Sequence, residues 1–182
     1  MAQENKMGTM PINKLLITMS LPMVISMLVQ AMYNIVDSIF VSMISQAALT
    51  AVSMAFPVQN LIIAVSAGTC VGVNALLSRS LGEKNQENAD LAAVNGVFLA
   101  VLGFAAFAVF GIFGAEIFFK SQTDNPEIIR MGTQYLQICC VFSFGIFGEM
   151  MFERILQSTG RTFFSMITQG TGAIINIFLD PV

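Results

Sequence analysis

Asp37 is an acidic residue inside a long apolar segment, and three polar side chains precede it at helical spacing. Gln30, Tyr33 and Asn34 lie seven, four and three residues earlier, so all four share one stripe of a helix. A carboxylate at membrane depth costs about 2.5–3.5 kcal/mol, and it therefore tends to face a cavity and to mark an ion or proton pathway. The alternative is a solvated helix end, but the uncharged tract 38–46 lets the helix continue beyond the acid.

A second polar group lies at the end of the chain, where Asn176 and Asp180 are four residues apart and share a helical face. Pro181 follows, and because proline has no amide hydrogen it leaves the carbonyl of Ile177 unpaired. An acid, an amide and a free carbonyl in one place suit a proton or a small cation, which oxygen ligands bind. The alternative is an ordinary helix end, which Asp-Pro commonly marks.

Two prolines, Pro22 and Pro57, lie inside apolar segments and predict helix kinks. Such kinks act as hinges in some membrane proteins and are static in others, so the spacing alone favours neither role.

The amino-acid composition indicates that these residues lie in a membrane protein. Apolar residues make up 55% of the 182 residues and charged residues only 10%, with a mean hydropathy of +0.76, whereas soluble domains are about a quarter charged. The net charge of −3 and the lack of a basic cluster argue against nucleic acid. The absence of His excludes His-based triads and metal sites, and Cys70, Cys139 and Cys140 are expected to be small buried residues. We therefore predict an integral membrane protein that is not an enzyme and has no cofactor.

The charged residues bound five apolar segments and predict an all-α membrane protein. A spanning helix needs about 20 mostly apolar residues. The expected spans are 13–41, 47–79, 90–118, 129–157 and 162–182. Short polar breaks separate them, so sequence neighbours should be antiparallel. The apolar runs are too long, and alternate too little, for a membrane β-barrel.

The Lys and Arg residues near the span ends predict a cytoplasmic N-terminus for this protein, which we expect in the plasma membrane. In that orientation six basic residues lie on the cytoplasmic side: Lys6, Lys14, Arg79, Lys84, Arg154 and Arg161. The opposite side carries only Lys120 and Arg130. A cleaved signal peptide over 13–31 is the alternative, but the apolar stretch runs to Ile44, longer than a usual signal core.

Six short segments together resemble the N-terminal part of the multidrug and toxic compound extrusion (MATE) transporters. They are Ser20-Leu21-Pro22, the run from Tyr33 to Val41, Ala55 to Asn60, Ser80-Leu81-Gly82, Leu156 to Arg161, and Asn176 to Pro181. Each is modest alone, but their order and spacing over the whole chain make the resemblance specific.

The resemblance implies twelve helices in two six-helix lobes around a central cavity, and export of amphipathic or cationic compounds in exchange for protons or sodium. For proton or cation coupling the resemblance implies Asp37, Asn176 and Asp180, and Na⁺ could bind at either acid. The residues expected to line the cavity are Gln30, Tyr33 and Asn34. The prolines expected to kink helices are Pro22, Pro57 and Pro181. Residues 1–182 would then be an incomplete N-terminal lobe without the C-terminal half. We expect such a fragment to lie in the lipid bilayer without transporting.

Three other functions compete with drug export. A lipid-linked oligosaccharide flippase of the same superfamily needs several cations for a pyrophosphate, and the spans carry no Lys or Arg away from their ends. An intramembrane aspartyl protease typically carries Tyr-Asp and Gly-x-Gly-Asp, whereas Val36 precedes Asp37 and Leu179 precedes Asp180. A structural membrane scaffold is the third alternative for the bare chain.

Overall fold

The computed structural model describes residues 10–44 and 46–179, and the regular structure of this part of the chain is helical throughout. Its helices are α2 (Ile12–Ile44), α3 (Gln46–Gly82), α4 (Gln86–Gln122), α5 (Pro126–Val141), α6 (Phe144–Ser158) and α7 (Thr162–Leu179). By length and composition, four described segments can cross a membrane: Ile12–Met32, Gln46–Gly82, Gln86–Lys120 and Pro126–Ser158. The last of these contains both α5 and α6.

The predicted all-α fold with five helices is confirmed, but the fourth helix is interrupted. The single expected helix over 129–157 is two helices, because α5 ends at Val141 and α6 begins at Phe144. At the break the buried hydroxyl of Ser143 donates a hydrogen bond to the carbonyl oxygen of Cys140 over 2.7 Å. The polar group thus keeps a partner in apolar surroundings. Neither of the two linking residues is Gly or Pro, so turn chemistry does not predict this break.

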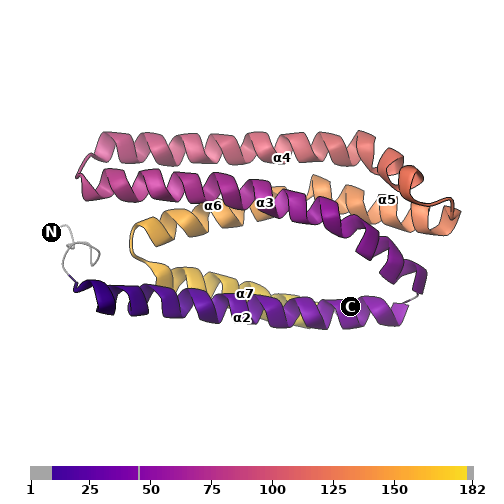
Figure 1. Cartoon of the computed structure of the whole chain (residues 1–182), viewed down its shortest axis with the longest axis horizontal. Helices are drawn as coiled ribbons and strands as arrows, with labels where there is room; N and C mark the ends of the chain where they lie inside the picture. Colours follow the sequence, from indigo (N-terminus) through magenta and orange to yellow (C-terminus); the bar gives the residue numbers. More distant parts are fainter. Residues whose placement is uncertain (1–9, 45, 180–182) are drawn as a thin grey trace.

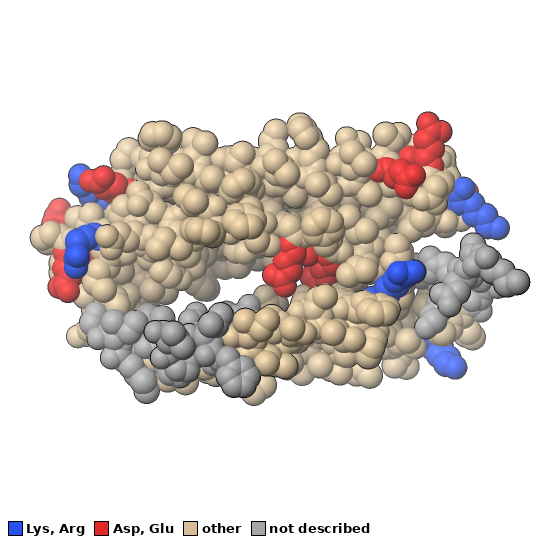
Figure 2. All heavy atoms as spheres, turned by 180° about the vertical axis from the view of Figure 1, so that it is seen from behind, with Lys and Arg blue, Asp and Glu red and all other residues tan. Residues whose placement is uncertain are grey.

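The helices form two groups (Figure 1). In one group α2 and α7 lie side by side, and in the other α3 packs against α4, α5 and α6. α2 and α7 run in the same direction, since Leu15 and Thr162, near their starts, line one small pocket. Charged side chains gather near both ends of the elongated molecule, and acidic side chains also lie midway along it (Figure 2).

Local capping explains where several helices begin. The side chain of Asn85 accepts a hydrogen bond from the backbone amide of Asn88 at the start of α4. Asn125 does the same for the amide of Glu127, one residue after Pro126 opens α5. Gly160, between α6 and α7, has a φ of 76°, a left-handed conformation that glycine adopts without steric cost.

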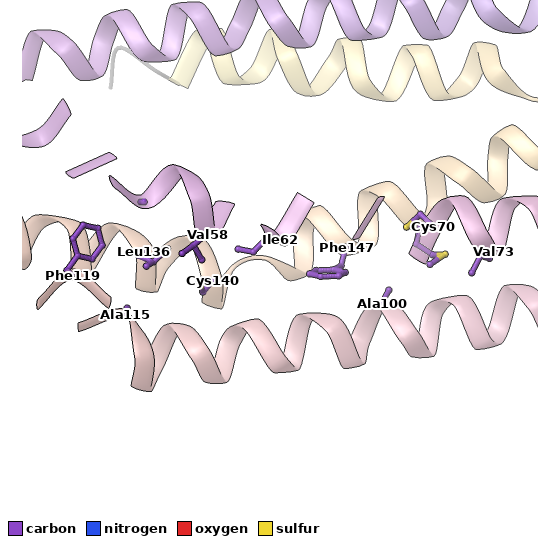
Figure 3. Close-up of a cluster of buried hydrophobic side chains, with 12 residues drawn as sticks. Val58, Ile62, Cys70, Val73, Ala100, Ala115, Phe119, Leu136, Cys140 and Phe147 are labelled. Atoms are coloured by element: carbon purple, nitrogen blue, oxygen red, sulfur yellow. The ribbon is translucent and has the colours of Figure 1, made fainter. Parts of the chain in front are cut away.

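The hydrophobic core lies among α3, α4, α5 and α6 (Figure 3). Fully buried side chains from each helix meet there, including Ile62, Phe119, Leu136 and Phe147. Because this core lies within the larger group, α2 and α7 are left free to form one wall of a cavity against α6.

Candidate functional site: a polar cavity between the two helix groups

A cavity of about 230 Å³ lies between the two helix groups, and polar side chains from three helices line it. They are Gln30 of α2, Gln169 of α7, and Glu149, Glu153, Arg154 and Gln157 of α6. Methionines 23, 27 and 150 supply most of the apolar wall. In Figure 2 the acidic side chains midway along the molecule lie beside the hollow between the helix groups. An apolar wall with a few convergent polar groups is typical of a ligand site.

Glu149 lies well inside a segment able to cross a membrane. It precedes Ser158, the last residue of α6, by nine residues, or about 14 Å at the rise of an α-helix. Its side chain is exposed and lines the cavity. It makes no hydrogen bond or ion pair with any residue that the structure describes. A carboxylate at such depth favours a proton or a cation beside it.

Glu153 lies one turn further along α6 and is held by two neutral donors. Gln157 Nε2 donates to Glu153 Oε1 over 2.7 Å, and the hydroxyl of Ser165 donates to the same oxygen over 3.0 Å. Ser165 belongs to α7, so this carboxylate links the two helix groups. Hydrogen bonds from neutral donors hold the carboxylate without cancelling its charge.

Arg154 is the cation of this cavity. Its Nη1 donates to Gln157 Oε1 over 2.6 Å, and its buried Nε has no hydrogen-bond partner in the described part of the chain. Arg154 lies four residues before the end of α6, and the cytoplasmic N-terminus that the distribution of Lys and Arg predicts stays a prediction.

The predicted stripe on α2 reaches this cavity through Gln30, which is exposed and lines it. Tyr33, Asn34 and Asp37 belong to the same helix, but their side chains lie outside the part that the structure describes. The backbone places position 37 seven residues, or about 10 Å, beyond Gln30 on the same helical face.

Helix α7, like α2, has a glutamine that lines the cavity and a polar residue seven positions later. Gln169 lines the cavity, and Asn176 follows it by seven residues on a helix that runs parallel to α2. The side chain of Asn176 is not described, and Asp180 and Pro181 lie outside the described residues. The roles of Asp37, Asn176 and Asp180 in coupling therefore stay predictions. The described residues contain no group of three or more Cys, Asp and Glu side chains able to hold a metal ion.

Pro22 and Pro57 lie inside the continuous helices α2 and α3. Nearby hydroxyls bond to carbonyl oxygens of their own helix, as Ser26 does to Pro22 over 3.0 Å and Ser53 to Leu49 over 2.8 Å. The hinge role of both prolines stays a prediction.

Sequence reasoning missed the polar stripe of α6. Glu149, Glu153 and Gln157 are spaced by four residues, the same signal that singled out Asp37. Glu149 and Glu153 also fit the end of an apolar span, so their charges alone do not mark a site. A search for polar residues at intervals of four inside each span finds them.

A larger hollow of about 690 Å³ lies between α3 and α4, near the loop that joins them. The two charged residues of its lining, Arg79 and Glu83, form an ion pair of 2.9 Å with side chains 77% and 55% exposed. Because its charges pair with each other at the surface, the smaller cavity is the better candidate site.

Comparison with known proteins decides the family. The MatE family profile matches residues 22–182. The chain belongs to the MatE family. The resemblance to MATE transporters expected from the sequence is thereby confirmed, and the fold is that of a membrane transporter family.

Two curated proteins are similar to the chain over almost its whole length. A protein of Shewanella oneidensis named "FAD transporter" is 27% identical over 172 residues, covering 94% of this chain and 38% of that protein. The "Probable multidrug resistance protein NorM" of Thermotoga maritima is 26% identical over 169 residues, covering 93% of this chain and 36% of that protein.

Among solved structures, a crystal structure of a MATE protein with a proline-to-alanine substitution superposes with a TM-score of 0.94. It is 27% identical, and the match covers 100% of this chain and 41% of the other. The chain therefore spans about two fifths of the length of the MATE proteins it matches.

Proposed function

We propose that this sequence forms the N-terminal lobe of a secondary active exporter in the plasma membrane, with a cytoplasmic N-terminus. The exporter moves amphipathic or cationic compounds outward in exchange for protons or sodium. Membership of the MatE family and the similarity to a protein named for multidrug resistance support this reaction class. Transport requires the complete protein, since the chain spans only about two fifths of its relatives.

The observation that carries the proposal is the charge of the cavity between α2, α6 and α7. Two carboxylates, Glu149 and Glu153, and one guanidinium, that of Arg154, line it. With both acids ionised the cavity has a net charge of −1, from two negative charges and one positive charge. Its methionines offer an adaptable apolar wall beside that charge. An amphipathic cation matches both features.

Exchange follows from competition for the same negative charge. A proton or sodium ion that neutralises an acid of the lobe weakens its hold on a cationic compound and shifts the equilibrium between lobe conformations. Asp37 is the proposed coupling acid. Its proposed partners are Asn176 of the parallel helix α7 and Asp180, which follows the last described residue of that helix in the sequence.

A flavin dinucleotide is the second candidate cargo, because one relative is named for FAD transport. Its pyrophosphate is anionic and calls for several cations around it. In the described cavity Arg154 is the one cation, and two carboxylates face the same space. The charge balance therefore favours a cationic compound, and the same argument disfavours a pyrophosphate-linked oligosaccharide.

Efflux from membrane vesicles tests the proposal. The complete transporter carrying this lobe should expel ethidium under an imposed proton gradient or an imposed sodium gradient, and the gradient that works identifies the coupling ion. FAD should not compete with ethidium. Transport of FAD without transport of ethidium would contradict the proposed substrate class.

A further inference from the structure

Gln157 stands between two opposite charges of the same helix. Arg154 Nη1 donates to its amide oxygen over 2.6 Å, and its amide nitrogen donates to Glu153 Oε1 over 2.7 Å. We propose that Gln157 is a positioning residue, a neutral spacer that keeps Arg154 from pairing with Glu153 and so leaves the charge of that carboxylate available to a cation. The inference rests on the proposed export of cationic compounds.

The chemistry of the neighbours fixes the orientation of the amide. Arginine carries only donors, so the oxygen of Gln157 faces Arg154 and its NH₂ group faces the carboxylate. The side chain of Gln157 is only 3% exposed, and Ser165, 3.4 Å from its Nε2, is equally buried. Reversing the amide would set donor against donor and carbonyl oxygen against carboxylate. Gln157 is therefore held in one orientation.

The result is a carboxylate held in place but not neutralised. Both of its hydrogen bonds reach Oε1, from Gln157 and from Ser165, and no described donor reaches Oε2. The ion pairs of the described chain are Arg79–Glu83 and Lys120–Glu116, and neither involves Glu153. A direct pair with Arg154 would cancel the charge that attracts a cation, whereas a bond from an amide preserves it.

Binding of tetraphenylphosphonium to the purified chain in lipid nanodiscs tests the spacer. Gln157→Leu frees Arg154 to pair with Glu153 and should weaken binding about tenfold, the scale of a single interaction with a charged group. Gln157→Asn keeps a polar side chain that is too short to bridge Arg154 and Glu153, and it should weaken binding similarly. It replaces the leucine variant in the test if that variant does not fold. Thr168→Val is the matched control, because Thr168 lies on α7 and bonds only to carbonyls of its own helix.

Rescue separates a spacer from a merely structural residue. Arg154→Gln removes a nearby positive charge and raises affinity somewhat in any background. The spacer predicts a larger gain in the Gln157→Leu chain than in the wild-type chain, because there it also frees Glu153. Equal gains, or wild-type affinity in Gln157→Leu and Gln157→Asn, would overturn the inference.

A ligand-free measurement keeps this result apart from the proposed function. In thermal unfolding, the coupling energy between Arg154→Gln and Glu153→Gln should be larger in the Gln157→Leu chain, where the two charges pair directly, than in the wild-type chain, where only the amide of Gln157 links them. Equal coupling energies in the two backgrounds would refute the spacer. If the expected difference is found but the wild-type chain does not bind tetraphenylphosphonium, the cation site in this lobe is contradicted and the spacer stands.

Discussion

Gly132 offers the sharpest test of how this lobe is packed. It is buried in α5 and faces the ring of Phe119 from α4, which is fully buried. A Cβ at position 132 would overlap that ring, whose Cδ1 would lie 2.7 Å away. The ring cannot turn aside freely, since Phe118 packs edge-on against it with centroids 5.5 Å apart. Gly132→Ala should therefore destabilise the fold.

Gly148 provides the opposite case in the same membrane segment. A Cβ there would meet nothing within 4 Å, and the residue lies inside α6. Replacing a helical glycine by alanine stabilises by about 0.5–1 kcal/mol, a gain that both substitutions share. Overpacking costs about 1–3 kcal/mol, and only Gly132→Ala incurs it. The two variants should thus differ by about 1–3 kcal/mol, or about 2–12 °C in Tm.

Thermal unfolding of the purified chain in one detergent, followed by helical circular dichroism, measures this difference. Gly148→Ala should melt at or above the wild-type temperature and Gly132→Ala below Gly148→Ala. Adding Phe119→Leu to Gly132→Ala should cost less than the sum of the two changes, because the smaller side chain makes room. Equal melting temperatures for the two glycine variants would refute the close approach of α5 to α4.

Three further outcomes are expected. Ser165→Ala removes the hydroxyl of α7 that donates to the carboxylate of Glu153, and it should lower the free energy of unfolding by about 1.5–3 kcal/mol. The control Thr168→Val should change the free energy of unfolding far less, because Thr168 bonds only to carbonyls of its own helix. Equal effects of the two substitutions would contradict the link between the helix groups. Asp37→Asn should leave membrane insertion of the complete transporter unchanged and abolish coupled ethidium efflux, so undiminished efflux refutes the coupling role. Tyr135→Phe removes the acceptor of Gln59 Nε2 at 2.9 Å and should cost about 0.5–1.5 kcal/mol in the same unfolding assay.

Most of the helix plan could be predicted because charge and turn chemistry mark its ends locally. Asn125 and Pro126 cap and open α5, and Gly160 supplies the left-handed turn before α7. The helices extend past the predicted limits because a charged residue can occupy a terminal turn: Asp90 lies inside α4 and Arg79 in the last turn of α3. Electrostatic cost limits how far a span enters the bilayer, but it does not end the helix.

The break between α5 and α6 could not be predicted, because no local sequence signal marks it. Neither of its two linking residues is Gly or Pro, and Ser143 is fully buried. Its hydroxyl satisfies the carbonyl of Cys140 within the break. The break separates α5 from α6, the helix that carries Glu149 and Glu153.

The same physical rule accounts for what sequence reasoning found in α2 and missed in α6. No other charged residue near Asp37 marks a helix end in contact with water, so the cost of its carboxylate at membrane depth predicts a cavity. Glu149 and Glu153 lie within a few helical turns of Arg161, at the end of the predicted span. Long charged side chains near a span end commonly reach the membrane–water interface, so a position at the interface explains these two acids as well as a cavity does. What distinguishes the two cases is Ser165, a hydroxyl on the next helix that donates to Glu153. That contact depends on how α7 packs against α6, and helical spacing within one segment does not contain it. Charged residues near span ends should therefore be assigned to a site or to an interface only after the neighbouring helix has been placed.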